Sequence, residues 1–385
     1  MNRIYLDNAA TTPVAAEVLQ KMLPYFSDVY GNASSIYATG REARKALENA
    51  RATVAAAIGA KPNEIYFTAG GSESDNWAIK GAAYANSGKG KHIITTAIEH
   101  HAVLNTCQYL EKKGFAVTYL PVDEFGRVTA EQVQAAITPE TILITIMAAN
   151  NEIGTLEPIE EIGRVARNHK TLFHSDAVQA MGAIPVDVVK WGVDMLSMSA
   201  HKIHGPKGAG VLYLKNGVRV DPLIHGGAQE RGRRAGTENL AGIVGTAEAV
   251  RLATKDLQEK AAKISALRDR LIAGVIRTIP DVRLNGHPTE RLPGNANFSV
   301  KFIEGEGMLL RLDMAGIAAS SGSACTSGSL DPSHVLLAIG LPHEIAHGSL
   351  RFSISDKTVQ EDIDEVLRVL PGIVNTLRDM SPIMA

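Results

Sequence analysis

Short apolar or β-branched runs alternate with amphipathic stretches along the first two-thirds of the chain. The run at 141–147 is apolar or β-branched throughout, which is typical of a strand buried on both faces. This alternation predicts an α/β fold whose mostly parallel sheet is covered by helices on both faces. We expect strands at 65–68, 92–95, 116–120, 141–147, 171–174, 195–198 and 210–214, and helices at 72–85, at 101–113 and from 158 onward.

The last third of the chain has a different pattern. An amphipathic and well-charged stretch from about 240 to 279 predicts one long helix. Two strands that look antiparallel follow at 296–302 and 350–355, with helical patterns around and after them. We read this third as a smaller α+β domain hinged on the long helix. The predicted domains are a large one at 13–257 and a small one made of 1–12 and 258–385.

The composition is that of an ordinary globular protein. With 385 residues, the chain is long enough for two domains of roughly 100–200 residues each. A net charge of −2 gives no reason to expect nucleic acid or an anionic membrane as a partner. No run reaches about 18 apolar residues, and the N-terminal apolar stretch is too short for a signal peptide. We therefore expect a cytoplasmic protein that neither crosses a membrane nor binds nucleic acid directly.

A lysine and an aspartate follow two neighbouring predicted strands. Lys202 comes after the strand at 195–198, and Asp176 after the strand at 171–174. Because parallel strands present their carboxyl ends to one crevice, both side chains should face the same site. Taken singly, Lys202 could be a surface lysine and Asp176 a helix N-cap. Together they fit pyridoxal phosphate, which needs a lysine for its aldehyde and an acid for its ring nitrogen.

A glycine-rich turn joins the strand at 65–68 to the helix that begins near Ser72. Gly70 and Gly71 let the backbone approach an anion closely, and a helix N-terminus offers free N–H groups and positive potential. Many strand–helix junctions look like this one, so the turn is a weak signal by itself. At the same crevice as Lys202, it predicts a phosphate site.

The two cysteines have opposite surroundings. Cys107 stands among valine and leucine residues, which predicts a core position. Cys325 lies in a stretch of serine, glycine, alanine and threonine that offers no apolar neighbour to bury it. An exposed thiol is a liability unless it is used, so we predict a reactive Cys325 on a mobile loop at about 320–332. A chain with only two cysteines also fits a reducing compartment.

Two further motifs allow more than one interpretation. The sequence His-Glu-Ile-Ala-His at 343–347 matches the HExxH of zinc peptidases, whose histidines need a stable helix and a third ligand. Pro342 and Gly348 would limit this helix to under two turns, so we favour a capped turn over a zinc site. The basic, glycine-rich run at 230–237 fits a solvated loop and an anion site equally well.

Together these residues resemble the cysteine desulfurase family, which has the aminotransferase-like fold (fold type I) of pyridoxal-phosphate enzymes. The most specific part is Ser-Ser-Gly-Ser-Ala-Cys at 320–325. Its long loop is similar to the group that serves nitrogen fixation and general iron–sulfur assembly, rather than to the short-loop group. The resemblance runs from end to end and also rests on 5–13, 67–76, 99–100, 150–154, 174–179, 199–207, 234–237 and 350–353.

The resemblance implies roles around the cofactor ring. Lys202 would carry pyridoxal 5′-phosphate as a Schiff base, and Asp176 would hold the ring nitrogen. His100 would lie over the ring and transfer protons. The remaining implied contacts are Asn151 and Gln179 on the 3′-oxygen side of the ring, and Arg351 with Asn151 on the substrate carboxylate, where the arginine fork matches a carboxylate as lysine could not.

The resemblance also implies a homodimer. Thr237 would reach the cofactor phosphate from the second subunit, which makes the basic run an intersubunit loop. Ser72 stands where many relatives have threonine, and it keeps the hydroxyl. Within its own subunit, the phosphate would be bound by Gly71, Ser72, Ser199 and His201.

The reaction that the resemblance implies removes sulfur from L-cysteine. Lys202, freed from the cofactor, would take the Cα proton, and the Cys325 thiolate would attack the substrate sulfur. L-Alanine leaves and Cys325 keeps a persulfide, while His100 sets the protonation of the thiols. The loop would then pass the sulfur to an iron–sulfur scaffold or another acceptor, and Cys325 could transiently ligate a cluster.

Three alternatives stay open on the sequence alone. An ordinary aminotransferase of the same fold would need no cysteine, a zinc peptidase would use the HExxH motif, and a binding module would keep the fold without catalysis. The acceptor is open as well, because relatives that dock a scaffold through a longer tail extend beyond the position of Ala385.

Overall fold

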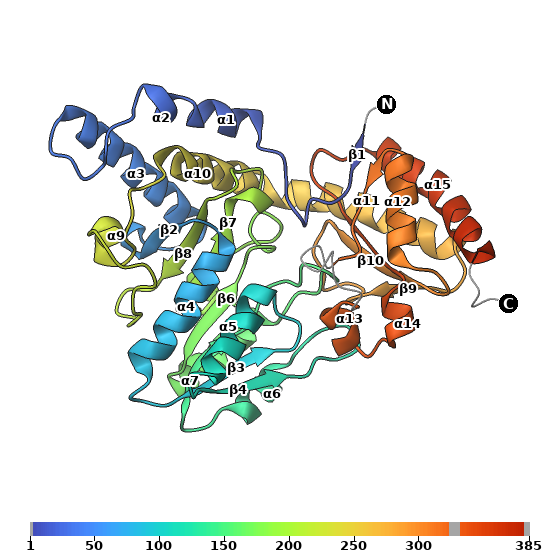
Figure 1. Cartoon of the computed structure of the whole chain (residues 1–385), viewed down its shortest axis with the longest axis horizontal. Coiled ribbons are helices and arrows are strands. Elements are labelled where there is room, and N and C mark those ends of the chain that lie inside the picture. The colour runs from blue at the N-terminus through green and yellow to red at the C-terminus, as the bar shows by residue number, and fades with distance from the viewer. Residues whose placement is uncertain (1–2, 323–331, 381–385) are drawn as a thin grey trace.

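The computed structural model describes residues 3–322 and 332–380. In these ranges the chain forms two parts that lie side by side (Figure 1). The larger part is built around a seven-stranded sheet, and the smaller part around a three-stranded sheet. The site residues predicted from the sequence come from both parts, so the arrangement of the two sheets decides which of them lie together.

The larger sheet has the strand order β2-β8-β7-β6-β5-β3-β4. Within the described residues, β8 is antiparallel to both of its neighbours, and the other neighbouring pairs are parallel. The predicted α/β fold with a mostly parallel sheet is therefore confirmed. The strands are β2 (Ile65–Thr68), β3 (His92–Thr96), β4 (Ala116–Leu120), β5 (Thr141–Thr145), β6 (Leu172–Asp176), β7 (Met195–Ser199) and β8 (Gly210–Leu214).

Two strand ends of the larger sheet differ from the prediction by two residues. β5 ends at Thr145, two residues before the end of the apolar run. β6 continues to Asp176, because its ladder with β7 extends to the pair Asp176 and Ser197. Asp176 is thus the last residue of a buried strand, and its side chain is fixed by the sheet itself.

Alternate side chains of the strands enter two separate cores. In β8, Val211 and Tyr213 belong to one core, and Leu212 and Leu214 belong to the other. Successive side chains of a strand point to opposite faces, so a strand covered on both sides is apolar at every position. This explains the continuous apolar runs of the sequence.

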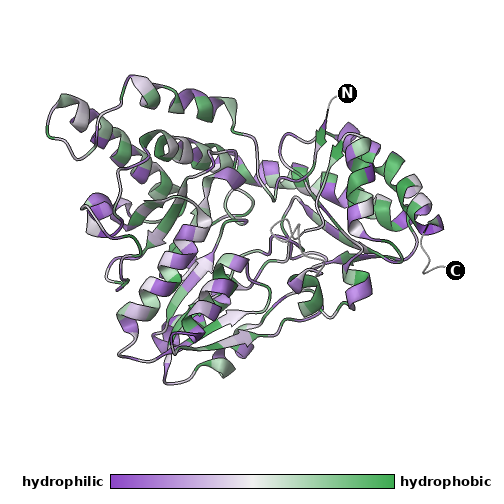
Figure 2. Cartoon of the chain, in the orientation of Figure 1, coloured by the Kyte–Doolittle hydropathy of each residue, from purple (hydrophilic) through white to green (hydrophobic). Residues whose placement is uncertain are grey.

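Helices cover both faces of the larger sheet (Figure 1). They carry hydrophobic and hydrophilic residues side by side, as expected of helices that pack one face on a sheet (Figure 2). The helices of the first core are α1 (Ala16–Met22), α3 (Ala38–Ala57), α6 (Ala130–Ala136), α7 (Ile159–His169), α8 (Val188–Trp191) and α10 (Leu240–Thr254). Those of the second core are α4 (Gly71–Asn86) and α5 (His101–Glu111).

Cys107 lies inside the second core and has no exposed surface. Burial raises the pKa of its thiol to about 12, so the thiol stays protonated at neutral pH. The prediction of a core position is confirmed, and this cysteine is chemically inert.

The prediction of one helix from 240 to 279 is wrong. α10 ends at Thr254, and a separate helix, α11 (Leu257–Thr278), follows it. Lys255 is extended and Asp256 has a left-handed backbone with φ 52°, which interrupts the helical hydrogen bonds. α10 packs on α1 and α3, whereas α11 packs on elements of the smaller part. The break therefore marks the passage of the chain from one core to the other.

The smaller part has an antiparallel sheet of order β12-β10-β9. The antiparallel pairing of the two predicted strands is confirmed, and β9 was missed because it is short and only half-buried. Leu6, Phe298 and Phe352 lie in the core of this part, so the N-terminal residues pack with the C-terminal third. The elements are β9 (Val282–Asn285), β10 (Asn295–Val300), β12 (Ser349–Ser353), α12 (Gly305–Met314), α15 (Gln360–Asp379) and the parallel pair β1 (Ile4–Tyr5) with β11 (Ile317–Ala318).

Two short helices, α13 (His334–Ala338) and α14 (His343–Ala346), pack between the parts against Ile98, Met147 and Ile153. α14 holds the first four residues of the HExxH motif, with His347 as its C-cap, and its length of one turn supports the capped turn. Among the described residues, no three His, Cys, Asp or Glu side chains are grouped to hold a metal ion. In the same residues, no helix is long and apolar enough to cross a membrane.

Candidate active site

A cavity of about 300 Å³ lies at the carboxyl ends of β6 and β7, and Arg351 of β12 lines it from the smaller part. Thr237 does not line it and is exposed on a loop, and Cys325 lies outside the described residues. The predicted site residues that do line it are Gly71, Ser72, His100, Asn151, Asp176, Gln179, Ser199, His201, Lys202 and Arg351. Lining residues that sequence reasoning missed include Ala9, Ala10, Asp75, His101, Glu152 and His334.

Lys202 reaches the cavity from the 3-10 turn Ala200–Lys202, which directly follows β7. Its Nζ donates hydrogen bonds to the carbonyl oxygens of Ala9 and Ala10, at 2.6 and 2.7 Å. These carbonyls belong to residues 7–12, which we call the N-terminal strap. The strap is part of the motif at 5–13 on which the family resemblance rests. Nothing in that motif indicates a contact with a lysine almost two hundred residues away.

The carboxyl group of Asp176 is buried at the end of β6. Its Oδ1 accepts a hydrogen bond from the backbone N–H of Val178 at 2.9 Å. Burial raises the pKa of Asp176, and the nearby His100, the Val178 N–H and Lys202 lower it. A cation placed against this carboxyl would favour its charged form further. Asp176 is therefore suited to hold a protonated ring nitrogen.

A buried hydrogen-bond chain supports the strand ends beside Asp176. His174 Nδ1 lies 2.8 Å from Thr145 Oγ1, and its Nε2 lies 2.9 Å from Ser197 Oγ. Burial lowers the pKa of His174 to about 3, so its ring is neutral at pH 7. Asp75 Oδ1 is 3.7 Å from that ring, and burial, together with Asp176, raises the pKa of Asp75 well above its ordinary value. The carboxyls of Asp75 and Asp176 thus lie close to His174, and the neutral ring of His174 supplies no positive charge to either of them.

His100 stands at the N-terminus of α5, where its Nδ1 accepts a hydrogen bond from the backbone N–H of Ala102 at 3.1 Å. Burial is the main cause that lowers the pKa of His100, so the ring is neutral at pH 7. Because Nδ1 is an acceptor, the single ring proton resides on Nε2. His100 can therefore offer an N–H donor to a group inside the cavity.

The glycine-rich turn forms a cradle at the N-terminus of α4. Gly70 has a φ of 156°, which other residues rarely adopt. A Cβ on Gly71 would lie 2.7 Å from Val178 Cγ2, so a side chain there would require Val178 to shift. Ser199 and His201 line the same cavity. Burial and nearby lysines lower the pKa of His201 to about 4, so it is a neutral hydrogen-bonding partner for an anion.

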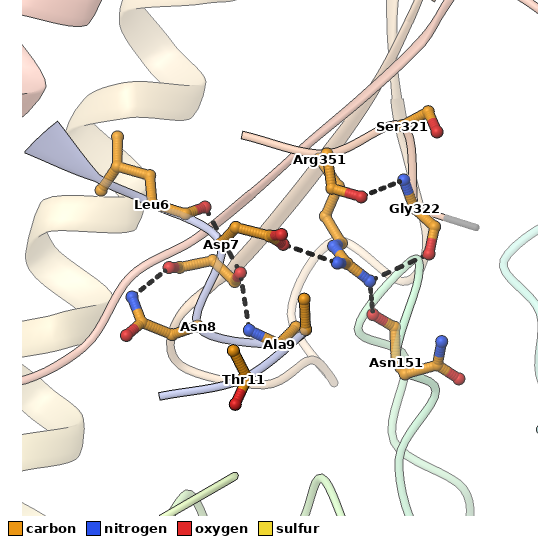
Figure 3. A network of polar contacts seen from close by, with 12 residues as sticks. Leu6, Asp7, Asn8, Ala9, Thr11, Asn151, Ser321, Gly322 and Arg351 are labelled. Atoms are coloured by element: carbon orange, nitrogen blue, oxygen red, sulfur yellow. Dashed lines mark hydrogen bonds and ion pairs between the residues drawn. The ribbon is translucent and has the colours of Figure 1, made fainter. Parts of the chain in front are cut away.

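The guanidinium of Arg351 joins three segments of the chain (Figure 3). Its Nη1 donates to the carbonyl oxygens of Asn151 and Gly322 at 2.8 and 3.0 Å, and its Nη2 donates to Asp7 Oδ1 at 2.8 Å. Its Nε has no hydrogen-bond partner among the described residues, although the side chain is only 2% exposed. A buried, unpaired N–H of a charged group at a cavity wall is a site for an anionic ligand.

Glu152 lies beside both ends of the segment 323–331, which contains Cys325. Its carboxylate accepts a short hydrogen bond from Ser333, the N-cap of α13. A Cβ added to Gly322 would lie 3.3 Å from Glu152 Oε2, so Gly322 passes close to the same carboxylate. Both flanks of the Cys325 segment are thus anchored next to the cavity.

The basic run that ends at Thr237 folds back on its own chain. Glu230 and Arg51 form a buried bidentate ion pair with hydrogen bonds of 2.8 and 2.9 Å. Arg234 binds Glu73, in the first turn of α4, at 2.9 and 3.1 Å. These pairs hold the loop close to the glycine-rich turn and leave Thr237 exposed.

Glu99 is a buried acid that belongs to the motif at 99–100 but received no role from the sequence. Its carboxylate accepts hydrogen bonds from Thr96 Oγ1 at 2.8 Å and from the Met147 N–H at 3.0 and 3.1 Å. Burial raises its pKa from 4.5 to about 8. The folded protein therefore keeps a proton on Glu99 that the unfolded chain loses at lower pH.

This difference predicts a pH dependence of stability. Between pH 4.5 and about 8 the folded state binds more protons at Glu99 than the unfolded state, so the free energy of unfolding falls as the pH rises. In Glu99→Gln, which cannot ionise, we expect this fall to be smaller by about 1–3 kcal/mol. Urea unfolding at pH 5 and pH 8 measures it, with the exposed Glu344→Gln as control. An unchanged fall in Glu99→Gln would contradict the assignment.

The chain matches the family model for class-V aminotransferases over residues 4–366. A cysteine desulfurase IscS of Methanosarcina thermophila is 57% identical over 380 residues, which cover 99% of this chain and 94% of the relative. A cysteine desulfurase IscS of Clostridium botulinum is 58% identical over 386 residues, which cover 100% of this chain and 97% of the relative. The chain belongs to the cysteine desulfurase family.

Solved structures place this family member in the same fold. A NifS-like protein superposes with a TM-score of 0.92 at 40% identity, over 97% of this chain and 100% of that one. The structure of SspA in complex with cysteine gives a TM-score of 0.82, also at 40% identity, over 92% of this chain and 100% of that one. The fold class expected from the sequence, that of pyridoxal-phosphate transferases, is confirmed.

Class-V aminotransferases and cysteine desulfurases are pyridoxal-phosphate enzymes, and the cavity of this family member fits such a cofactor. It presents an amine at Lys202, a buried carboxyl at Asp176 and a backbone cradle at Gly71. The turn at Gly71 suits the phosphate, because it lines the cavity at the N-terminus of α4, where backbone N–H groups are available to an anion. The three groups together match the aldehyde, the ring nitrogen and the phosphate.

Proposed function

We propose that the protein is a pyridoxal 5′-phosphate-dependent cysteine desulfurase that takes sulfur from L-cysteine and leaves L-alanine and a persulfide on Cys325. One observation carries the proposal: the Lys202 amine, the Asp176 carboxyl and the Arg351 guanidinium line one cavity, beside both flanks of the Cys325 segment. Relatives that bear the name cysteine desulfurase match essentially the whole chain, which supports it.

The chain's own residues would hold the cofactor at both ends. Lys202 would bind the aldehyde, and Asp176 would pair with the ring nitrogen. When bound, pyridoxal phosphate supplies an electron sink for the charge that develops at the substrate Cα. The other proposed contacts are Gly71, Ser72, Ser199 and His201 at the phosphate, and Asn151 and Gln179 at the ring's 3′-oxygen side.

Lys202 would also move the Cα proton. Its Nζ is held by the carbonyl oxygens of Ala9 and Ala10, which fix the position of the amine at the end of β7. A general base needs to lie within hydrogen-bond reach of the proton that it takes, and a fixed amine meets this need. The charge of Lys202 acts on the neighbouring groups of the cavity and lowers the pKa values of Asp176, His100 and His201.

Arg351 would bind the substrate carboxylate. A guanidinium has five N–H donors, and three of those of Arg351 already have partners. The two N–H groups that remain, one on Nε and one on Nη2, can donate parallel hydrogen bonds to the two oxygens of a carboxylate. Asn151, whose backbone carbonyl accepts from Arg351, lines the cavity next to it.

Replacement of Arg351 by lysine should show whether substrate binding needs only the positive charge or also the planar arrangement of the guanidinium N–H groups. Lysine keeps the positive charge but loses the fork and the bonds to Asn151 and Gly322. We expect the KM for L-cysteine to rise about 10- to 100-fold, the size of the loss of a charge-assisted hydrogen bond. Steady-state kinetics of alanine formation measures it. A KM close to that of the unaltered protein would exclude Arg351 from the carboxylate site.

Cys325 would receive the sulfur. It follows Gly322 by three residues, and a chain of three extended residues spans roughly 10 Å. The Gly322 carbonyl accepts from Arg351, so the intervening chain is long enough for the thiol to reach a substrate held there. The Nε2 proton of His100 can hydrogen-bond a thiolate in the cavity and so favour the reactive form.

We also propose a homodimer, with Thr237 contributing to the partner's phosphate site. Thr237 is exposed on a loop that the ion pair of Arg234 anchors, which supports this proposal. Several large apolar side chains in the N-terminal segment 19–37 are also exposed to solvent. Exposed apolar groups of this size often mark interfaces between proteins. These side chains are Leu19, Leu23, Phe26, Tyr30, Ile36 and Tyr37.

The destination of the sulfur stays a prediction. An iron–sulfur scaffold or another acceptor would take it from Cys325, as the family resemblance implies. The cytoplasmic location and transient cluster binding by Cys325 are likewise predictions.

Mass spectrometry of the protein after incubation with L-cysteine tests the proposed function. We expect one added sulfur atom on the peptide that contains Cys325 and none on the peptide that contains Cys107, whose thiol is buried. Incubation with L-serine, which has no sulfur, is the control. Alanine formation without any added sulfur on Cys325 would refute the proposal.

A further inference from the structure

Asp7 is the charged partner of the proposed carboxylate-binding arginine. Its Oδ1 accepts from Arg351 Nη2 at 2.8 Å, and the Arg351 side chain is 2% exposed while that of Asp7 is 19% exposed. Asp7 lies 344 residues before Arg351 in the sequence, and an isolated parallel bridge between Asp7 and Ser353 of β12 brings the two together. Figure 3 shows Asp7 on one side of the guanidinium, with Gly322 and Asn151 on the other.

The backbone around Asp7 is held firmly by β12. The N–H of Ser353 donates to the Leu6 carbonyl at 2.7 Å, and the side chain of Asn8 donates to the Ser353 carbonyl at 2.7 Å. The N–H of Ala9 donates to Ser353 Oγ at 2.8 Å. The Asp7 carboxylate is therefore a fixed reference point against which the guanidinium is oriented.

The strap continues from Asp7 to the catalytic lysine. Its Ala9 carbonyl accepts from Gln179 Nε2 at 3.0 Å and, together with the Ala10 carbonyl, from Lys202 Nζ. The backbone N–H of Thr12 donates to the His201 carbonyl at 2.9 Å, which closes the strap on the larger part. One short segment thus connects Arg351 at one end of the cavity with Lys202 at the other.

We propose that Asp7 is a positioning residue for the substrate carboxylate. By occupying one Nη2 proton it turns the Arg351 guanidinium so that Nε–H and the second Nη2 proton stay available as a fork. Because Asp7 belongs to the strap, it also fixes the span between the carboxylate site and the Lys202 amine. The inference deepens the proposed function and rests on it, since it assumes that Arg351 binds the carboxylate of L-cysteine.

Two ligands that differ only in the carboxylate test the role of Asp7. L-Cysteine and cysteamine share the amine and the thiol, but cysteamine lacks the carboxylate. In the cofactor-loaded Cys325→Ser protein, titration of the cofactor absorbance gives an apparent Kd for each. We expect Asp7→Ala to weaken L-cysteine about tenfold or more, the size of one charge-assisted hydrogen bond, and to change cysteamine less than about twofold.

Asp7→Asn refines the same test. Asparagine keeps an oxygen that can accept from Arg351, so it should restore most of the preference for L-cysteine. The matched control is Asp364→Ala. Asp364 also pairs with an arginine, Arg270, but this pair lies on the surface of the smaller part and involves no residue of the strap. This variant should leave both Kd values unchanged.

Each other result overturns the proposal in a distinct way. Equal weakening of both ligands in Asp7→Ala would mean that Asp7 only supports the fold. Unchanged preference for L-cysteine would show that Arg351 is oriented without it. If the Cys325→Ser parent itself does not prefer L-cysteine to cysteamine, the carboxylate site is wrong, and the proposed function fails together with the role of Asp7.

Discussion

Replacement of Lys202 by alanine should give a protein that neither retains pyridoxal phosphate covalently nor turns over L-cysteine. The amine is the group of the described cavity that can bind an aldehyde, and it would also take the Cα proton. Loss of a nucleophile and a base in one residue should lower the rate by about a thousandfold or more. The measurements are the absorbance of the purified protein, its bleaching by borohydride, and alanine formation.

Lys207 provides the matched control for this variant. It lies five residues further along the same loop and is exposed. Lys207→Ala should remain yellow, and its turnover should stay close to that of the unaltered protein. If Lys202→Ala keeps a borohydride-sensitive colour and an unchanged rate, the cofactor is attached elsewhere and the site is misassigned. A colourless protein in all variants would favour the binding module that the sequence left open.

Replacement of Cys325 by serine should abolish the conversion of L-cysteine to alanine and leave cofactor binding intact. A serine hydroxyl is not ionised at neutral pH and is a poor nucleophile toward sulfur, so the carbon–sulfur bond has no acceptor. We expect the rate of alanine formation to fall by about a thousandfold or more. The cofactor absorbance should still respond to added L-cysteine, since binding does not require the thiol.

Cys107→Ala controls for the loss of a thiol. Cys107 has no exposed surface, and burial raises its pKa to about 12, so its removal should cost stability and spare the rate. Persistence of alanine formation in Cys325→Ser would contradict the desulfurase mechanism. Conversion of the cofactor to its amine form by a keto acid in that variant would point to an ordinary aminotransferase, as the class-V match alone would allow.

The electrostatics of the cavity follow from burial more than from ion pairs. Burial lowers the pKa of His100 and of His201, so both rings are neutral and act as hydrogen-bond partners. Burial also raises the pKa of Asp75 and of Asp176, and a cation placed against either carboxyl would favour its charged form. The cavity is therefore prepared for a cofactor with a protonated ring nitrogen and an anionic phosphate at opposite ends.

The smaller part contributes the groups that would bind substrate and deliver the thiol. Arg351 comes from β12, and Gly322 and Ser333 flank the Cys325 segment beside Arg351 and Glu152. The larger part contributes Lys202, Asp176 and the glycine-rich turn. A relative movement of the two parts would change the distance between the Arg351 guanidinium and the Lys202 amine, which the N-terminal strap connects.

Much of the fold is encoded locally. A strand covered on both faces is mostly apolar, so the strands of the larger sheet could be predicted from largely apolar runs such as that of β8. Lys202 and Asp176 could be placed at one site, because neighbouring parallel strands end at the same edge of a sheet. The contrast between Cys107 and Cys325 was equally visible, since each thiol's neighbours in the chain decide whether it can be buried.

The tertiary structure decided what depends on contacts between distant segments. The helix break at Asp256 carries no glycine or proline signal and exists because α10 and α11 belong to different cores. The pairing of Asp7 with Arg351, and of the Ala9 and Ala10 carbonyls with Lys202, joins residues that are hundreds of positions apart. Periodicity and composition report on burial along one segment, whereas the partner of a buried charge is fixed only when the sheets and helices have packed.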